Sequence, residues 1–268
     1  SGVITNMAGE NYVGTAYTFQ SKVVDRELWM WGKNEHGQLG LNTRDNGEGR
    51  SSPVQLPGTT WSKVSNANYF THAIKSDGTL WSWGYNDYGS MGVGQPSSYK
   101  VSSPVQVGSG TNWKPETLLV TYDGGMCCKS DGTLWSWGYG NPGQLGQNNR
   151  TSYSSPVQVG SDSTWRTGSA GIYSILATKT DNTLWAWGRN TYGSLGLNTQ
   201  SEGGERSSPT QIGSATDWDR TIGGWDNGNL ALKTNGTLWV WGLNDDGELG
   251  QNNNVDYSSP VQIPGTTW

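Results

Sequence analysis

Apolar and polar positions alternate most regularly in a five-residue pattern, Leu-Trp-x-Trp-Gly, which the chain carries five times. The copies recur at intervals of 50 to 54 residues and begin at Leu28, Leu80, Leu134, Leu184 and Leu238. Because successive side chains of a strand point to opposite faces, both Trp lie on one face, and Leu and residue x lie on the other. Both faces are apolar or small, which predicts a strand sandwiched between two neighbouring sheets.

Three further strands are predicted in each unit. A short run before Leu-Trp ends in Asp-Gly, Asp-Asn or Asn-Gly, which predicts a type I′ hairpin turn. Another strand begins at Ser-Ser-Pro, because proline is tolerated at the first residue of a strand. The fourth strand of the same unit is predicted to begin at a third Trp, which recurs as Trp61, Trp113, Trp165, Trp218 and Trp268.

Four short strands repeated about every fifty residues are typical of the blades of a β-propeller. We therefore predict an all-β fold, in which residues 1–268 form a single domain of five four-stranded blades. The N-terminal residues are expected to close the ring, with 3–7 supplying an outer strand and 12–19 a first strand. The alternative is that the five units are part of a larger ring.

Several of these landmarks together resemble the repeat of the regulator of chromosome condensation family. They are a strand such as His72-Ala73-Ile74, then Asp-Gly, Leu-Trp-x-Trp-Gly and Asn-x-x-Gly-Gln-Leu-Gly, and residues 31–40 match them best. The resemblance covers nearly the whole chain and implies a propeller that acts through protein contacts on its faces. Known members usually have seven blades. Guanine-nucleotide exchange, known for the founding member, is not expected, because no blade carries an inserted wedge.

Composition changes this picture little. Fifteen of the sixteen Trp occupy repeated positions, and Trp225 is the exception. The net charge of −5 argues against binding to nucleic acid or to an anionic membrane surface. No stretch reaches the ~18 apolar residues that a membrane span needs, so a soluble protein is expected. The compartment stays open, with the extracellular space and a particle surface among the options.

Two sets of variable segments are predicted to share one face of the propeller. The first set joins Gly-x-Leu-Gly to Ser-Ser-Pro, and the second joins one blade to the next, near the central axis. Aromatic and acidic residues of the second set could anchor a protein or stack on a sugar. The predicted partner-binding residues are Tyr12, Tyr69, Phe70, Tyr122, Asp123, Tyr173, Trp225 and Asp226. The alternative is that these loops vary because nothing constrains them.

The sequence offers no catalytic set. His36 and His72 occupy non-equivalent repeat positions, and His72 is interpreted as structural. The adjacent Cys127 and Cys128 are interpreted as small strand residues, and no cluster of metal ligands or cofactor motif is found. Residues 45–48 contain oxygen ligands but lack the alternate spacing of a calcium loop. We therefore predict no catalytic residues, no metal and no cofactor.

These observations favour a non-catalytic binding or scaffolding module that holds a macromolecular partner, with a protein preferred, on the variable-loop face. A carbohydrate-binding lectin is the alternative, weakened because the loops differ between repeats. A glycosidase-like enzyme is a weaker alternative still, because its carboxylates would have to converge on one cleft.

Overall fold

The structure is a computed structural model that describes residues 20–24, 26–45, 49–199, 204–225, 227–266 and 268. In this part of the chain, nineteen strands form five antiparallel sheets, which confirms the predicted all-β architecture. Its helical elements are single 3₁₀ turns, and none is long or apolar enough to cross a membrane.

Each sheet uses one continuous stretch of the chain. Sheet 1 contains β1 (Gln20–Val24), β2 (Glu27–Gly32) and β3 (Arg50–Leu56), and sheet 2 contains β4 (Trp61–Asn66), β5 (Phe70–Lys75), β6 (Leu80–Asn86) and β7 (Tyr99–Gln106). Sheet 3 contains β8 (Leu119–Thr121), β9 (Gly124–Cys128), β10 (Leu134–Gly138) and β11 (Tyr153–Gln158). Sheet 4 contains β12 (Trp165–Ala170), β13 (Ser174–Lys179), β14 (Leu184–Gly188) and β15 (Arg206–Gln211). Sheet 5 contains β16 (Trp218–Trp225), β17 (Gly228–Lys233), β18 (Leu238–Gly242) and β19 (Tyr257–Gln262).

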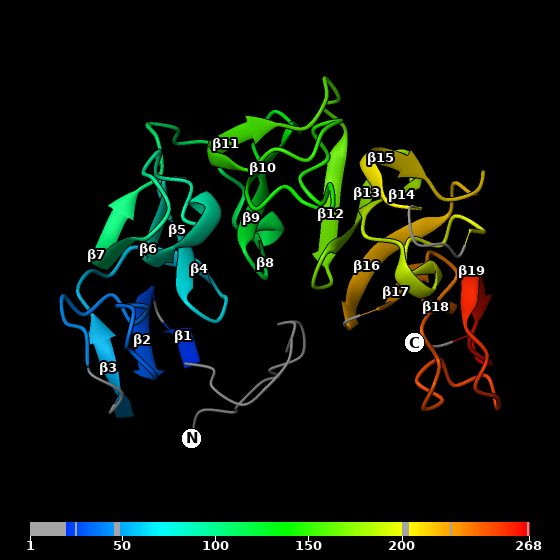
Figure 1. The fold of residues 1–268 in the computed structure, drawn as a ribbon, viewed down its shortest axis with the longest axis horizontal. Coiled ribbons are helices and arrows are strands. Elements are labelled where there is room, and N and C mark those ends of the chain that lie inside the picture. Colours follow the sequence, from blue (N-terminus) through cyan, green and yellow to red (C-terminus); the bar gives the residue numbers. More distant parts are fainter. Residues whose placement is uncertain (1–19, 25, 46–48, 200–203, 226, 267) are drawn as a thin grey trace.

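The sheets follow an arc in the order of the sequence (Figure 1). The first strands of sheets 2 to 5 (β4, β8, β12 and β16) lie on the inside of the arc, and each contacts the next. The Ser-Ser-Pro strands β3, β7, β11, β15 and β19 lie on the outside (Figure 1). Ring closure by the N-terminal segment was predicted on residues 3–7 and 12–19, which lie outside the described residues.

The strand opened by the third Trp is not the fourth of its own unit, as predicted, but the first of the following sheet. Trp61 begins β4, and β4 pairs with β5 rather than with β3. The reason is aromatic packing, because the Trp61 ring lies edge-on to Trp81 and Trp83 of sheet 2, at 6.4 and 5.7 Å between centroids. Trp113, Trp165 and Trp218 repeat this arrangement in the next three sheets.

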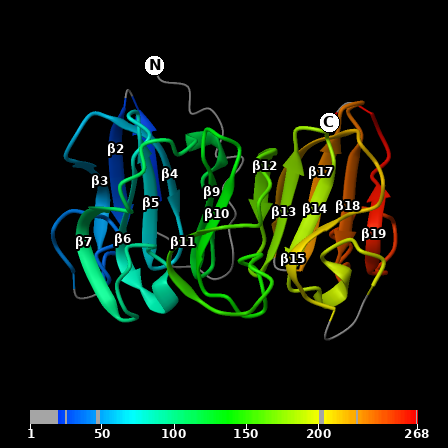
Figure 2. The same ribbon diagram turned by 90° about the horizontal axis from the view of Figure 1, so that it is seen from above.

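This correction redefines the loops but keeps the predicted face. The segments thought to join blades connect the first and second strands of one sheet, as 67–69 connects β4 to β5. The segments after Gly-x-Leu-Gly connect the third strand to the fourth. In an antiparallel meander these two connections emerge on the same side of the sheet, here called the loop face. The 3₁₀ turns η1 (Asp87–Gly89) and η3 (Thr191–Gly193) both lie on that side, at the lower edge of Figure 2.

The hairpin turn on the opposite side, here called the turn face, is not of type I′ as predicted. The Gly78 N–H donates to the carbonyl of Lys75, and Gly78 has a φ of +76°. Asp77 is not in the positive-φ region, so the turn is a type I turn followed by one left-handed residue, a G1 bulge. The Asp77 carboxylate stabilises it by accepting hydrogen bonds from the Thr79 amide and hydroxyl.

The core lies between sheets rather than within one layer. At the junction of sheets 2 and 3, Ile74, Leu80 and Val107 of sheet 2 pack against Cys127 and Trp137 of sheet 3. The Leu and x side chains of one sheet thus meet the Trp face of the next, as the two-sided apolar pattern predicted. Similar clusters fill the other three junctions of the arc.

Two hydrogen bonds recur at each of the four junctions. In the inner bond, the indole N–H of the second Trp donates to a carbonyl in the Gly-x-Leu-Gly loop of the preceding sheet. The pairs are Trp83 to Gln38 (2.8 Å), Trp137 to Ser90 (3.1 Å), Trp187 to Gln144 (2.9 Å) and Trp241 to Ser194 (2.9 Å). In the outer bond, a loop amide donates to a Ser carbonyl of the next Ser-Ser-Pro strand. These pairs are Asn42 to Ser102, Gly94 to Ser154, Asn148 to Ser207 and Asn198 to Ser258.

At each end of the arc, the described residues supply only one of the two sides of such a junction. A Cβ added to Gly196 in sheet 4 would lie 2.9 Å from the Trp241 indole nitrogen, whereas at Gly250 in sheet 5 no described atom lies within 4 Å. At the other end, Trp31 of sheet 1 is half-buried, while Trp83, Trp137, Trp187 and Trp241 are fully buried.

We expect Trp137→Ala to lower the free energy of unfolding by about 3–5 kcal/mol, as large truncations in a core do. Trp135→Ala is expected to cost clearly less, because this first Trp of the same motif is only half-buried. Urea unfolding of both variants checks the order, and equal losses would contradict the burial difference.

Gly196→Ala and Gly250→Ala form a matched pair, because both glycines have a positive φ, +68° and +62°. Each variant is expected to lose about 1 kcal/mol for placing a Cβ in the left-handed region. Gly196→Ala should lose about 1–3 kcal/mol more by overpacking against Trp241. Equal losses in urea unfolding would show that a Trp also covers Gly250 in solution.

Candidate functional site

Four of the loops that lead into a Ser-Ser-Pro strand are held from inside by a buried Asn. Asn86 Oδ1 accepts a hydrogen bond from the Met91 amide, and its Nδ2 donates to the Gln95 carbonyl. Asn34, Asn190 and Asn244 do the same in sheets 1, 4 and 5. The base of each of these loops is therefore fixed, and the side chains on it are displayed in defined positions.

Four tyrosines from three sheets form a continuous group on the loop face, here called the tyrosine cluster. The centroids of Tyr88 and Tyr139 are 4.6 Å apart, those of Tyr139 and Tyr173 6.3 Å, and those of Tyr173 and Tyr122 6.2 Å. Tyr88 lies in η1 of sheet 2, Tyr122 and Tyr139 lie in sheet 3, and Tyr173 precedes β13 of sheet 4. All four side chains reach the surface, and Tyr88 is 47% exposed.

Asp123 lies beside this cluster, in the turn between β8 and β9. The Tyr139 amide donates to the Asp123 carbonyl at 2.9 Å. Burial raises the pKa of the Asp123 carboxyl to about 6, and the negative charge of Asp87 adds to the effect. Burial and the Asp123 charge also raise the pKa of Tyr173, whereas Arg189 acts in the opposite direction. Among the described residues, nothing donates a hydrogen bond to the Asp123 carboxylate or forms an ion pair with it.

Basic groups of this chain lie on one ring of the cluster and on a tyrosine of the neighbouring junction. The Arg189 guanidinium lies 4.6 Å from the Tyr173 ring centre. At the junction of sheets 1 and 2, His36 stacks on Tyr85 at 5.2 Å and meets Tyr69 edge-on at 5.0 Å, and Lys100 lies 5.0 Å from Tyr85. Burial lowers the pKa of His36, and the Lys100 charge lowers it further.

The structure brings together three of the residues predicted from the sequence, namely Tyr122, Asp123 and Tyr173. Tyr69 lies on the same face at the neighbouring junction. Phe70, however, is only 2% exposed and packs on the His72 ring, so it belongs to the core and not to a binding surface. Trp225 ends β16, opposite Gly228, while Tyr12, Asp226 and the Trp225 side chain lie outside the described residues.

Sequence reasoning missed Tyr88, Tyr139, Tyr85, His36 and Arg189. A signal was available. Tyr85, Tyr139 and Arg189 each follow the Trp-Gly of a repeat, and His36 and Tyr88 each precede the Gly of a Gly-x-Leu-Gly or Gly-x-Met-Gly element. These two repeat positions face each other at the first two junctions, which the sequence alone does not reveal.

Comparison with known proteins follows the same repeats. The "Regulator of chromosome condensation (RCC1) repeat" matches residues 25–74, 77–115, 131–177, 181–219 and 235–267, which is most of the chain. The chain belongs to the RCC1 repeat family. The resemblance inferred from the sequence is therefore confirmed.

Relatives of this RCC1-repeat propeller are longer than it is. It is 26% identical to the ultraviolet-B receptor UVR8 and 27% identical to the mitochondrial RCC1 domain-containing protein RUG3, both of Arabidopsis thaliana. Each match covers 93% of this chain but only 56% and 61% of the relative. The structure of Prp20p from Saccharomyces cerevisiae shares the fold, with a TM-score of 0.79 at 20% identity over 94% of this chain and 64% of that one. None of these names supports the extracellular or particle-surface location considered from the sequence.

The buried titratable groups of this RCC1-repeat chain have structural surroundings. Burial lowers the pKa of His72 to about 3, and its Nε2 lies 3.3 Å from the Trp137 indole nitrogen. Burial likewise raises the pKa values of Cys127 and Cys128 to about 12 and 11, so both stay protonated thiols. Within the described ranges, no three His, Cys, Asp or Glu side chains are grouped so that they could hold a metal ion.

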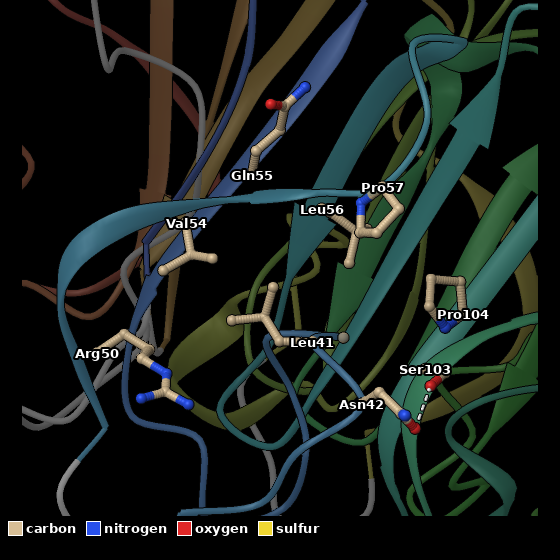
Figure 3. A pocket seen from close by; sticks show the side chains of 10 residues that line it. Leu41, Asn42, Arg50, Val54, Gln55, Leu56, Pro57, Ser103 and Pro104 are labelled. Atoms are coloured by element: carbon tan, nitrogen blue, oxygen red, sulfur yellow. Dashed lines mark hydrogen bonds between the residues drawn. The ribbon is translucent and has the colours of Figure 1, made fainter.

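A groove of about 540 Å³ lies on the outer rim, at the junction of sheets 1 and 2 (Figure 3). Leu41, Val54, Pro57 and Pro104 supply its apolar lining. Arg50 also lines it, and its guanidinium lies 3.4 Å from a carboxylate oxygen of Asp45. None of the predicted partner-binding residues lines this groove, which marks a rim feature distinct from the tyrosine cluster.

Asp123→Asn is expected to remove a pH dependence from the stability of the fold. The folded-state pKa of Asp123, about 6, lies above the ordinary 3.8, so the protonated carboxyl favours the folded state. Its contribution to the free energy of unfolding is complete below pH 3.8 and is lost as the pH rises through 6. Relative to wild type, the variant should gain about 1 kcal/mol between pH 5 and pH 7.5, a value reduced for the partial exposure of the carboxyl. Urea unfolding at the two pH values measures it. A constant difference between the proteins would contradict the burial of Asp123.

Proposed function

We propose that this protein is a non-catalytic binding or scaffolding propeller that holds a protein partner on its loop face, at the tyrosine cluster. The observation that carries the proposal is the convergence of four surface tyrosines from three sheets. Tyrosine supplies a large contact area with little loss of side-chain entropy and is enriched in protein interfaces. The loop that carries Tyr88 is fixed by the buried Asn86, so this part of the surface needs little ordering on binding.

A protein with the same fold supports the proposal that the partner is a protein. Prp20p binds Gsp1p and histones, which are proteins. At 20% identity this likeness shows the fold alone, so the identity of the partner is not carried over.

An enzymatic or lectin function has less support on this face. Asp87 and Asp123 are two carboxylates at the cluster. Among the described residues, neither carboxylate is hydrogen-bonded to a histidine, a thiol or a serine hydroxyl that would complete a catalytic set. A propeller lectin with repeated sites would need the same side chains at each junction. The residues before Gly in the loops are instead His36, Tyr88, Pro142, Tyr192 and Asp246.

The proposal is tested by locating the binding surface of a partner. Proteins that crosslink to the purified chain are identified, and the affinity of each is measured for wild type and two variants. Tyr88→Ala, at a half-exposed ring of the cluster, is expected to weaken binding by about tenfold or more, as the loss of an interface aromatic does. Ser163→Arg, in the exposed link between β11 and β12 on the turn face, should leave the affinity unchanged.

Both variants should keep the melting temperature of wild type within a few degrees, because both sites are at the surface. A partner that loses affinity through Ser163→Arg and keeps it in Tyr88→Ala would assign binding to the turn face. That result would make the proposal wrong.

A further inference from the structure

We propose that the tyrosine cluster, together with Asp123, binds a basic side chain, Lys or Arg, of the protein partner. This inference rests on the proposed function and names the chemistry that the loop face recognises. It concerns the junction of sheets 2 and 3 and the adjoining edge of sheet 4.

The geometry of the rings is the first support. Tyr88, Tyr139, Tyr173 and Tyr122 follow one another at centroid distances of 4.6 to 6.3 Å, with interplanar angles of 48° to 62°. Tilted rings at these distances present both π faces and edges along one continuous row. Cations are attracted to such faces, by about 0.5–1 kcal/mol per ring at exposed sites and about 2 kcal/mol where water is excluded.

The carboxylate is the second support, because none of the described side chains forms an ion pair with it. The groups around Asp123 are Asp87 from η1, Tyr122 and Tyr139 from its own sheet, and Tyr173 and Arg189 from sheet 4. Asp87 raises the Asp123 pKa, whereas Arg189 makes no contribution to it and acts on Tyr173 instead. A partly buried carboxylate near a neutral tyrosine ring and a second carboxylate is complementary to a cation.

The neighbouring junction supplies an internal comparison. There the chain provides its own basic groups, because His36 stacks on Tyr85 and the Lys100 ammonium lies over the same ring. The residue that corresponds to His36 at the junction of sheets 2 and 3 is Tyr88, the residue before Gly89. Among the described residues, no Lys or Arg lies over Tyr88, Tyr122 or Tyr139. A basic group from outside would complete at this junction the arrangement that His36 and Lys100 form at the first.

The charge distribution favours a basic side chain over a neutral one. A sugar or an aromatic side chain would also stack on tyrosines, but it would leave the Asp123 carboxylate partly buried and without a counter-charge. A guanidinium or ammonium group pairs with the carboxylate and lies on the rings at the same time.

The test uses a pentapeptide, acetyl-Gly-Gly-Arg-Gly-Gly-amide, and the same peptide with citrulline, which has the shape of Arg without its charge. The full chain is labelled with ¹³C in the tyrosine rings and titrated with each peptide by NMR. The Arg peptide is expected to bind in the millimolar range and to shift Tyr88, Tyr122, Tyr139 and Tyr173. The citrulline peptide should bind at least about tenfold more weakly, the loss of one charge-assisted contact.

Two variants and the pH complete the experiment. Asp123→Asn is expected to weaken binding of the Arg peptide by about tenfold, whereas Tyr192→Ala, an exposed ring of the next junction on the same face, should leave it unchanged. Arginine stays charged across this range, so affinity should fall as the pH drops from 7.5 to 5 and Asp123 takes up a proton. The Asn variant should show no such fall.

Equal binding of the two peptides, absence of binding at millimolar concentration, or an unchanged affinity in Asp123→Asn would each overturn the inference. Shifts confined to Tyr69 and Tyr85 would also overturn it, because they would place the cation at the junction of sheets 1 and 2. A different result would refute the proposed function itself. A partner that binds the loop face but tolerates replacement of its own Lys and Arg residues would refute the cation site alone, and a partner on the turn face would refute the proposed function.

Discussion

In sheets 2 to 5, the buried indole N–H of the second Trp donates a hydrogen bond across the junction, and leaving this donor unpaired would cost about 1–3 kcal/mol. The acceptor lies in the preceding sheet, on the loop that carries the variable residues. Trp137 thus fills the junction of sheets 2 and 3 and fixes the Ser90 carbonyl, two residues after Tyr88. The contact between Tyr88 and Tyr139 depends on this constraint, since the two rings belong to sheets that the bond holds in register.

The repeated pattern was sufficient to predict the class of fold, because alternation and turn residues are local signals. It was not sufficient to assign each strand to its sheet. The strand that Trp61 begins is joined to β3 and to β5 by links of similar length, residues 57–60 and 67–69. The packing of the Trp61 ring on Trp81 and Trp83 assigns this strand to sheet 2. The turn type failed for a related reason. Asp-Gly favours a type I′ turn in isolation. Here Thr79, two residues after Asp77, donates hydrogen bonds from its amide and its hydroxyl to the Asp77 carboxylate, and these bonds stabilise the type I turn.

The candidate site was predicted in part. Tyr122, Asp123 and Tyr173 stand out as aromatic and acidic residues of variable loops, so composition alone identified them. Tyr88 and Tyr139 occupy repeat positions that look unremarkable until two sheets are placed side by side. Phe70 was assigned to the surface because it lies in the variable segment 66–72, which was expected to join two blades. The inner strands of a propeller are covered on both faces, however, and β5 is buried along nearly its whole length.

The repetition of one junction also governs how the molecule responds to stress. Among the described sheets, the three central ones are each held at two junctions and the first and fifth at one. Stability in such a chain is close to a sum of nearest-neighbour terms, so opening starts where neighbours are fewest and spreads inward. The tyrosine cluster spans sheets 2, 3 and 4, the segment that would retain protection longest. A partner held there would remain bound while the outer sheets exchange their amide hydrogens with solvent.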